Sequence, residues 1–297
     1  MTLFVVTNFY QYSYQCLLKY RQHMAVAIFA ILISSVCSAL PIQQIAITET
    51  GNLGDNHDPA YYFENLLILA LDKTRATDGD YTLVHNKHGG GIARDRAMII
   101  AGMGIDIMWA SATKEREQQM RVIPVDLLKN LNNYRVLLIN KDAQPLFSNL
   151  QTLDDLKKFT VGSGEHWTDG SIMKDNGFNV TVTSSYVGLF RMLAARRFNF
   201  ISRGLHEVGY DVQTYKSLDL AQETSLLLAY DTPIRYCFFV NKNNLALADR
   251  VERGLKIAQK DGSFDELFYK IPSFKEGEEL LKSSHRHLIT LKNAKSD

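Results

Sequence analysis

The fold is decided by residues 152–162, TLDDLKKFTVG, and by the elements that follow them. Residues 152–158 predict a short helix, and residues 159–162 predict a strand that runs into Ser163-Gly164. A second helix is expected over residues 168–176, closed by Gly177, before a further strand at 180–183. Strands that alternate with helices in this way predict an α/β protein with a largely parallel sheet.

The same alternation extends along most of the chain. Further strands are expected at residues 42–48, 81–85, 105–109, 135–139, 198–202, 226–229 and 236–240. Further helices are expected at residues 60–73, 92–101, 185–197, 248–260 and 263–270. No long linker separates these elements, so we expect two lobes that share crossing strands.

Composition narrows the class of protein. The chain has 297 residues, of which 46% are hydrophobic and 22% charged, with only 6 Pro, which excludes a disordered or fibrous protein. A formal net charge of +1 argues against a nucleic-acid-binding protein. Three Cys are too few for a disulfide scaffold, and Cys237 lies in an apolar strand, where we expect a small buried residue.

The N-terminal segment has the features of an export signal. Residues 1–39 contain no Asp or Glu. Lys19 and Arg21 are followed by an apolar run and then by small residues that end at Ala39, after which we expect cleavage. The apolar run of about a dozen residues is short against the ~20 that span a bilayer, although an uncleaved anchor is the alternative. Translation could start at Met1 or Met24. We predict a signal peptide over residues 1–39, hence a periplasmic protein whose exported part has a net charge of −1.

Four segments in order resemble the family 3 extracellular solute-binding proteins, the polar amino-acid class with the type II periplasmic binding fold. GIDI at 104–107 with TKER at 113–116 is similar to the family's G-x-D and T-x-x-R segment. Residues 152–162 resemble its entry into the second lobe, residues 189–199 its helix-to-strand corner, and residues 251–267 its closing helix pair.

The resemblance implies a two-lobed fold with mixed, mostly parallel sheets flanked by helices and a ligand cleft between the lobes. The lobes would cover residues 40–145, then 146–233, with residues 234–297 returning to the first lobe and ending in helices. It also implies a monomeric binding protein, not an enzyme, for a small anionic or polar metabolite such as an amino acid or carboxylate. No cofactor is implied, and the partner would be a permease of an ABC transporter or a membrane sensor.

Departures from the family pattern mark a divergent branch. The loop between Asp106 and Arg116 is shorter than usual, and Asn199 replaces the corner Asp. The family's acid for the ligand ammonium would fall around Arg203-Gly204, where no carboxylate stands. The ligand therefore does not follow from the scaffold motifs.

Arg116 is the first candidate for the ligand site. A guanidinium offers a planar donor fork that matches a carboxylate, and the resemblance assigns this position to the ligand's carboxylate. The alternative is a surface helix charge among Lys114, Glu115 and Glu117.

A second candidate is the turn from the strand at 159–162 into the helix at 168–176. Free N–H groups at a helix start favour an anion, with Thr168 as the expected N-cap and Trp167 closing over the ligand. The alternative is a capped loop with Trp167 packed between lobes.

Arg203 is the third candidate, because it follows a strand end where ligands gather in α/β folds. Beside Arg116 it would select a dianion; the alternative is an ion pair with Glu207 at i,i+4 spacing. Five more residues could line the cleft: Trp109, Ser111, Thr113, Tyr186 and Glu49.

The sequence leaves two alternatives to a transport-linked binding protein, an enzyme and a sensory module, and it contains one weak metal-binding motif. Cyclohexadienyl and arogenate dehydratases resemble this family, and Glu165, His166 or Glu49 would then supply the acid. A sensory module is the other alternative. His85 and His88 lack a carboxylate or Cys to complete a metal site, so we expect none.

Overall fold

The computed structural model describes residues 42–49, 58–87, 91–283 and 285–294. The expected signal peptide, residues 1–39, lies outside them. Among the described residues, no helix has both the length and the apolar character that a bilayer span requires.

The first lobe is built on two small sheets. The strands β1 (Gln43–Thr48) and β2 (Tyr81–Asn86) pair in parallel, and β11 (Tyr236–Val240) lies between β3 (Ile107–Ser111) and β4 (Arg121–Val122), antiparallel to both. Asp106 bonds the two sheets together, because its amide donates to Ala46 O at 2.8 Å and its carboxylate accepts from Ala46 N at 2.7 Å. The aspartate of the G-x-D segment thus holds β1 beside β3.

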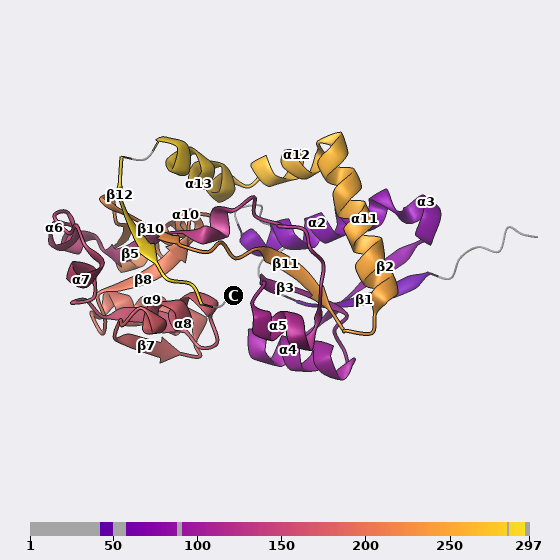
Figure 1. Ribbon diagram of the computed structural model, residues 1–297, viewed down its shortest axis with the longest axis horizontal. Helices are drawn as coiled ribbons and strands as arrows, with labels where there is room; N and C mark the ends of the chain where they lie inside the picture. The colour runs from indigo at the N-terminus through magenta and orange to yellow at the C-terminus, as the bar shows by residue number, and fades with distance from the viewer. Residues whose placement is uncertain (1–41, 50–57, 88–90, 284, 295–297) are drawn as a thin grey trace, which may run out of the picture. The chain divides into compact units, whose positions relative to one another are not determined.

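Side-chain alternation along β11 divides the core of this lobe. Phe238 and Val240 face the cluster formed with α2 (Pro59–Lys73) and α11 (Leu245–Asp261), whereas Cys237 and Phe239 face the cluster under α4 (Ile92–Ala101). Figure 1 shows α11 crossing α2 and continuing into α12 (Ser263–Tyr269). Cys237 is fully buried, as expected, and its burial raises the pKa of the thiol to about 12.

The second lobe contains a mixed sheet of seven strands, ordered β12-β10-β5-β8-β6-β7 with β9 against β5. β10 and β12, β6 and β7, and β6 and β8 pair in parallel, whereas β5 runs antiparallel to β8, β9 and β10. The strands are β5 (Tyr134–Asn140), β6 (Val161–Gly164), β7 (Val180–Thr183), β8 (Phe200–Gly204), β9 (Leu220–Gln222), β10 (Leu226–Tyr230) and β12 (His287–Leu291).

Helices accompany both lobes. Those of the first lobe not yet bounded are α3 (Arg75–Asp78) and α5 (Lys114–Gln119). Those of the second part of the chain are α6 (Gln144–Phe147), α7 (Leu153–Leu156), α8 (Thr168–Asp175), α9 (Tyr186–Ala194), α10 (Val208–Thr214) and α13 (Pro272–Ser283). Single 3-10 turns lie at Leu131–Asn133, Lys141–Ala143 and Lys216–Leu218.

The expected fold class, two α/β lobes with helices around mixed sheets, is confirmed by this arrangement and by the structural neighbours reported below. The strand pairing nevertheless differs from the expected boundaries. β5, expected in the first lobe, pairs with β8 and β10 because its apolar run is buried at the middle of the larger sheet. β12 adds to β10, so residues 287–291 end in the second lobe (Figure 1).

Candidate functional site

Side chains from both lobes enclose a cavity of about 90 Å³. Ala110, Ser111 and Arg116 come from β3 and α5, and Arg203 comes from the end of β8. The remaining lining residues are Ile92, Asn132, Arg135, Trp167, Thr168, Asp169, His206, Glu207, Tyr230 and Tyr236. A cavity of this volume is large enough for a few water molecules or for the head group of a small ligand.

Arg116 reaches the cavity from the first turn of α5. Thr113 caps that helix by accepting from the amide of Arg116 at 3.3 Å, which fixes the start of the helix beside the end of β3. The Arg116 side chain then donates through Nη1 to Ser111 O at 2.8 Å and to Thr168 Oγ1 at 2.9 Å. The second bond joins the two lobes.

Arg116 is a buried cation without an acidic partner. It is 6% exposed, and in the described part of the chain it forms no ion pair, while its Nε atom has no hydrogen-bond acceptor. Burial lowers the pKa of the guanidinium, although an arginine remains charged at neutral pH. Because a buried charge is costly until it is paired, this side chain presents unused capacity to bind an anion.

The start of α8 differs from the expected capping. Trp167, not Thr168, occupies the N-cap position and makes no side-chain capping bond. The Thr168 hydroxyl instead accepts the bond from Arg116, which turns it away from the helix amides. The N-terminus of α8 therefore lies at the cavity wall without a side-chain cap.

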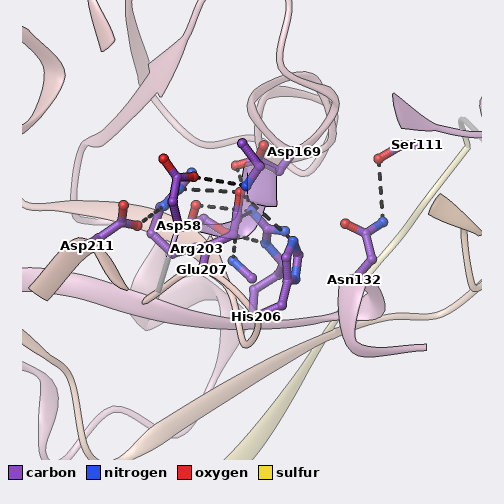
Figure 2. A network of polar contacts seen from close by, with 12 residues as sticks. Asp58, Ser111, Asn132, Asp169, Arg203, His206, Glu207 and Asp211 are labelled. Carbon is purple, nitrogen blue, oxygen red and sulfur yellow. Dashed lines mark hydrogen bonds and ion pairs between the residues drawn. The ribbon is translucent and has the colours of Figure 1, made fainter. Parts of the chain in front are cut away.

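Arg203 is neutralised by acids of its own lobe. Its Nε lies 2.5 Å from Asp211 Oδ2 and its Nη2 lies 3.3 Å from Glu207 Oε1 (Figure 2). Its guanidinium also lies 4.9 Å from the Trp167 ring centroid, and it donates to Tyr186 Oη at 3.3 Å. The i,i+4 pair with Glu207 that the sequence suggested is thus present, and Asp211 reinforces it.

Arg135 is a cavity residue that the sequence reasoning missed, and Asp169, at the end of the second candidate segment, was given no role there. Arg135 lies on β5, where its Nη2 is 3.4 Å from Asp169 Oδ2 and 3.7 Å from Glu207 Oε2. Burial raises the pKa of the Asp169 carboxyl against the lowering effect of Arg135. The signal in the sequence was a charged residue near the start of an otherwise apolar strand, because burying a charge is costly and the side chain is therefore expected to contact other polar groups.

The pKa values of Glu207 and His206 are set by their burial and by the charges of their neighbours. Burial raises the pKa of Glu207, but Arg203, His206 and Arg135 outweigh it and bring the value to about 2. His206 is 3% exposed with no partner for Nδ1, and its burial lowers the pKa of the imidazole to about 4. At neutral pH the site therefore contains an ionised Glu207 beside a neutral His206.

The other sequence candidates are distributed between the cavity and its surroundings. Ser111 lines the cavity, whereas Trp109 stacks on Phe63 in the first-lobe core at 5.4 Å between ring centroids. Tyr186 stands behind Arg203 and donates to Asp211 Oδ1 at 3.1 Å. Glu49 is not among the lining residues and pairs with Lys87 at 3.2 Å. The ligand-binding roles of all these residues stay predictions.

The candidate acids of the dehydratase alternative lie apart from the cavity. Glu165 and His166 are exposed on the turn before α8, and His166 has a positive φ of 64°. His85 pairs with Glu64 at 2.9 Å, and His88 lies outside the described residues. Within the described ranges, no three His, Cys, Asp or Glu side chains converge as a metal site.

Comparisons with known proteins support the fold. No protein-family model matches the chain, and no curated protein matches it by sequence. A histidine kinase sensor domain with similarity to periplasmic binding proteins is similar in structure, with a TM-score of 0.58 and 15% identity over 79% of this chain and 97% of that one.

Two amino-acid-binding structures have comparable TM-scores. A periplasmic binding protein of Salmonella typhimurium described for its high arginine specificity has a TM-score of 0.58 and 15% identity over 77% of this chain and 99% of that one. An ancestral arginine-binding protein has a TM-score of 0.55 and 17% identity over 78% and 98%. These likenesses show a two-lobed periplasmic-binding-protein fold.

Proposed function

We propose that this chain is an exported solute-binding receptor whose lobes close on a small ligand carboxylate held by Arg116. The observation that carries the proposal is the buried Arg116 guanidinium, which has neutral acceptors from both lobes and no acidic partner in the described residues. A ligand carboxylate at this position would supply the missing charge and favour the closed form over the open one.

The charges on the opposite side of the cavity would complement the head group of an amino acid. Arg135 and Arg203 are surrounded by three carboxylates, those of Asp169, Glu207 and Asp211. This cluster has one more acid than base, whereas Arg116 is an unpaired base. A zwitterion with its carboxylate on Arg116 and its ammonium toward Asp169 and Glu207 would complement both charges.

A membrane partner would read the closed form. The structural neighbours include a substrate-binding protein of an amino acid ABC transporter and a histidine kinase sensor domain, so the fold suits both a permease and a sensor as partner. Either role requires export, which the signal-like segment at residues 1–39 supports.

A matched thermal-shift screen tests the proposal. Each carboxylate in the screen, with and without an α-ammonium, is paired with its neutral amide. We expect stabilisation by at least one carboxylate and by none of the amides, and we expect Arg116→Gln to abolish it. Stabilisation by amides and carboxylates alike, or an Arg116→Gln protein that responds as the wild type does, would contradict the proposal.

A further inference from the structure

A larger chamber lies against the outer side of the cavity. It has a volume of about 480 Å³, and Arg116, Trp167 and Thr168 line both this chamber and the cavity. The cavity of about 90 Å³ accommodates little more than the head of a ligand. The rest of any larger ligand held by Arg116 would therefore extend into this outer chamber.

The outer chamber is positively charged. Arg96, Lys114 and Arg116 line it, with Glu115 as the one carboxylate among its lining residues. Glu115 is already paired with Arg96, whose Nη1 lies 3.0 Å from Glu115 Oε1. Lys114, in the described part of the chain, forms no ion pair. Two positive charges are thus uncompensated here, on Lys114 and Arg116.

The start of α8 adds to this field. Thr168 and Ser171 from its first turn line the chamber, and no side chain caps the helix. The helix has 8 residues, and its N-terminal amides carry partial positive charge. The buried Arg116 lines both spaces, and its Nε atom lacks an acceptor, which is a second observation that points to an anion at this junction.

We propose that the outer chamber is an anion-binding subsite that selects a ligand with a negatively charged tail. The ligand's carboxylate head contacts Arg116 from the cavity, and its anionic tail is bound by Lys114 at the start of α5, with Arg96 adjacent. The ligand class is a short dianionic carboxylate or an acidic amino acid. This inference rests on the proposed function and adds the subsite that discriminates among carboxylates.

Two pairs of ligands that differ only in tail charge test the subsite. The first pair is L-glutamate and L-glutamine, and the second is glutarate and its half-amide; dissociation constants are measured by titration calorimetry on the full chain. We expect the charged member of at least one pair to bind about fivefold more tightly than its amide, as an ion pair between the tail and the exposed Lys114 provides. The preference should weaken with added salt, because the chamber is open to solvent.

The variant Lys114→Gln tests whether the outer chamber causes the preference for charged ligands over their amides. In this variant we expect the ratio between charged and amide ligands to fall to about twofold or less, with the amide's affinity unchanged. Lys174→Gln, which removes an exposed lysine at the other end of α8, is the matched control and should keep the wild-type ratio.

The outcomes separate the two proposals. If the amides bind as tightly as the charged ligands, or if Lys114→Gln keeps the wild-type ratio, the subsite is contradicted while the role of Arg116 stands. If none of the four ligands binds, the subsite is contradicted, and the role of Arg116 is decided by the wider carboxylate screen. If Arg116→Gln binds the ligands as the wild type does, the subsite and the proposed function are both contradicted.

Discussion

Individual residues of the cavity are held in fixed charge states by burial and by their charged neighbours. Arg203 and Asp211 are 3% and 0% exposed, and their ion pair persists because Glu207 and Tyr186 add further polar contacts. His206 stays neutral in the same cluster. The cluster thus fixes the wall opposite Arg116 before any ligand arrives.

The titration of His206 gives a prediction about stability and pH. Its folded pKa of about 4 lies below the value of 6.5 for an unperturbed histidine. Between these values the unfolded chain binds a proton that the folded chain excludes, so His206 costs stability as the pH falls from about 6.5 to about 4. We expect the wild type to lose on the order of 3 kcal/mol relative to His206→Gln over this range.

Chemical denaturation of both proteins at pH 7, 5.5 and 4 measures this difference. The comparison with His206→Gln is required because Asp211, with a pKa raised to about 6 by burial, changes stability in the opposite direction over part of the same range. A difference between the two proteins that stays constant with pH would contradict the assignment.

The sequence reveals some of these residues and hides others for physical reasons. Arg116 could be named in advance because residues 113–116 resemble a family motif, and Thr168 because it lies at the start of an expected helix, where side chains reach a cleft. Arg135 and Asp211 could not be matched with partners, because the ion pairs that explain them join β5 to α8 and β8 to α10. Sequence spacing carries no information on such contacts.

At the scale of elements, the turn from β6 into α8 depends on a close approach to Trp167. A Cβ on Gly164 would lie 2.3–2.6 Å from atoms of the Trp167 indole, so no side chain fits there without moving the ring. The ring in turn lies on Arg203 and lines both the cavity and the outer chamber.

We therefore predict that Gly164→Ala weakens ligand binding by about tenfold or more, since a misplaced wall residue loses its contacts with the ligand. Calorimetric titration with the best ligand of the carboxylate screen measures this effect. Wild-type affinity in Gly164→Ala would show that the position of Trp167 does not matter for binding.

The crossing of α2 and α11 depends on a second close approach. A Cβ on Gly254 would lie 1.9 Å from the carbonyl oxygen of Ala70, which is backbone and cannot rotate away. We predict that Gly254→Ala lowers the free energy of unfolding by about 3 kcal/mol, despite the gain of roughly 1 kcal/mol in helix propensity.

Gly209→Ala provides the control for this prediction. Gly209 is also within a helix, but its nearest neighbour is the flexible end of Glu276 at 2.9 Å. Urea denaturation should show unchanged or slightly increased stability for Gly209→Ala. Equal effects of the two substitutions would contradict the packing argument.

Most elements were predictable because their apolar residues repeat with a clear period. The buried residues of α2 follow i, i+3, i+4 spacing, and β11 is a continuous apolar run. The strand β12 was not expected, because only Ile289 and Leu291 are buried in it and it gains its place by pairing with β10. The helix α13 was missed for the same reason, since few of its residues are buried.

At the scale of the whole molecule, the two lobes share a wall through Arg116 and Thr168, and Trp167 stands at that wall. The chain contains only two tryptophans, and Trp109 packs in the first-lobe core. Trp109→Phe therefore leaves a single reporter at the closing surface.

In this variant we predict that the best ligand of the screen shifts tryptophan emission to shorter wavelength, because closure excludes water from the half-buried Trp167 ring. The complementary Trp167→Phe protein should show no such shift. An equal shift in both variants would mean that the change does not report on the wall of the cavity.

The two-lobed architecture was predictable from four ordered scaffold motifs, whereas the division of the chain between the lobes was not. That division depends on which sheet β5 and β12 join, and strand partners far apart in sequence are not encoded in local periodicity. The same limit applies to the outer chamber, whose lining combines α4, α5 and α8.

The central claim is that Arg116 binds the ligand's carboxylate, and one measurement tests it most directly. It is the ratio of dissociation constants for the best carboxylate between wild type and Arg116→Gln, with Arg191→Gln as a control on the exposed surface of α9. Loss of charged hydrogen bonds predicts at least about thirtyfold weaker binding in Arg116→Gln and no change in Arg191→Gln. A ratio near one for Arg116→Gln, in a protein that unfolds as cooperatively as the wild type, would contradict the account.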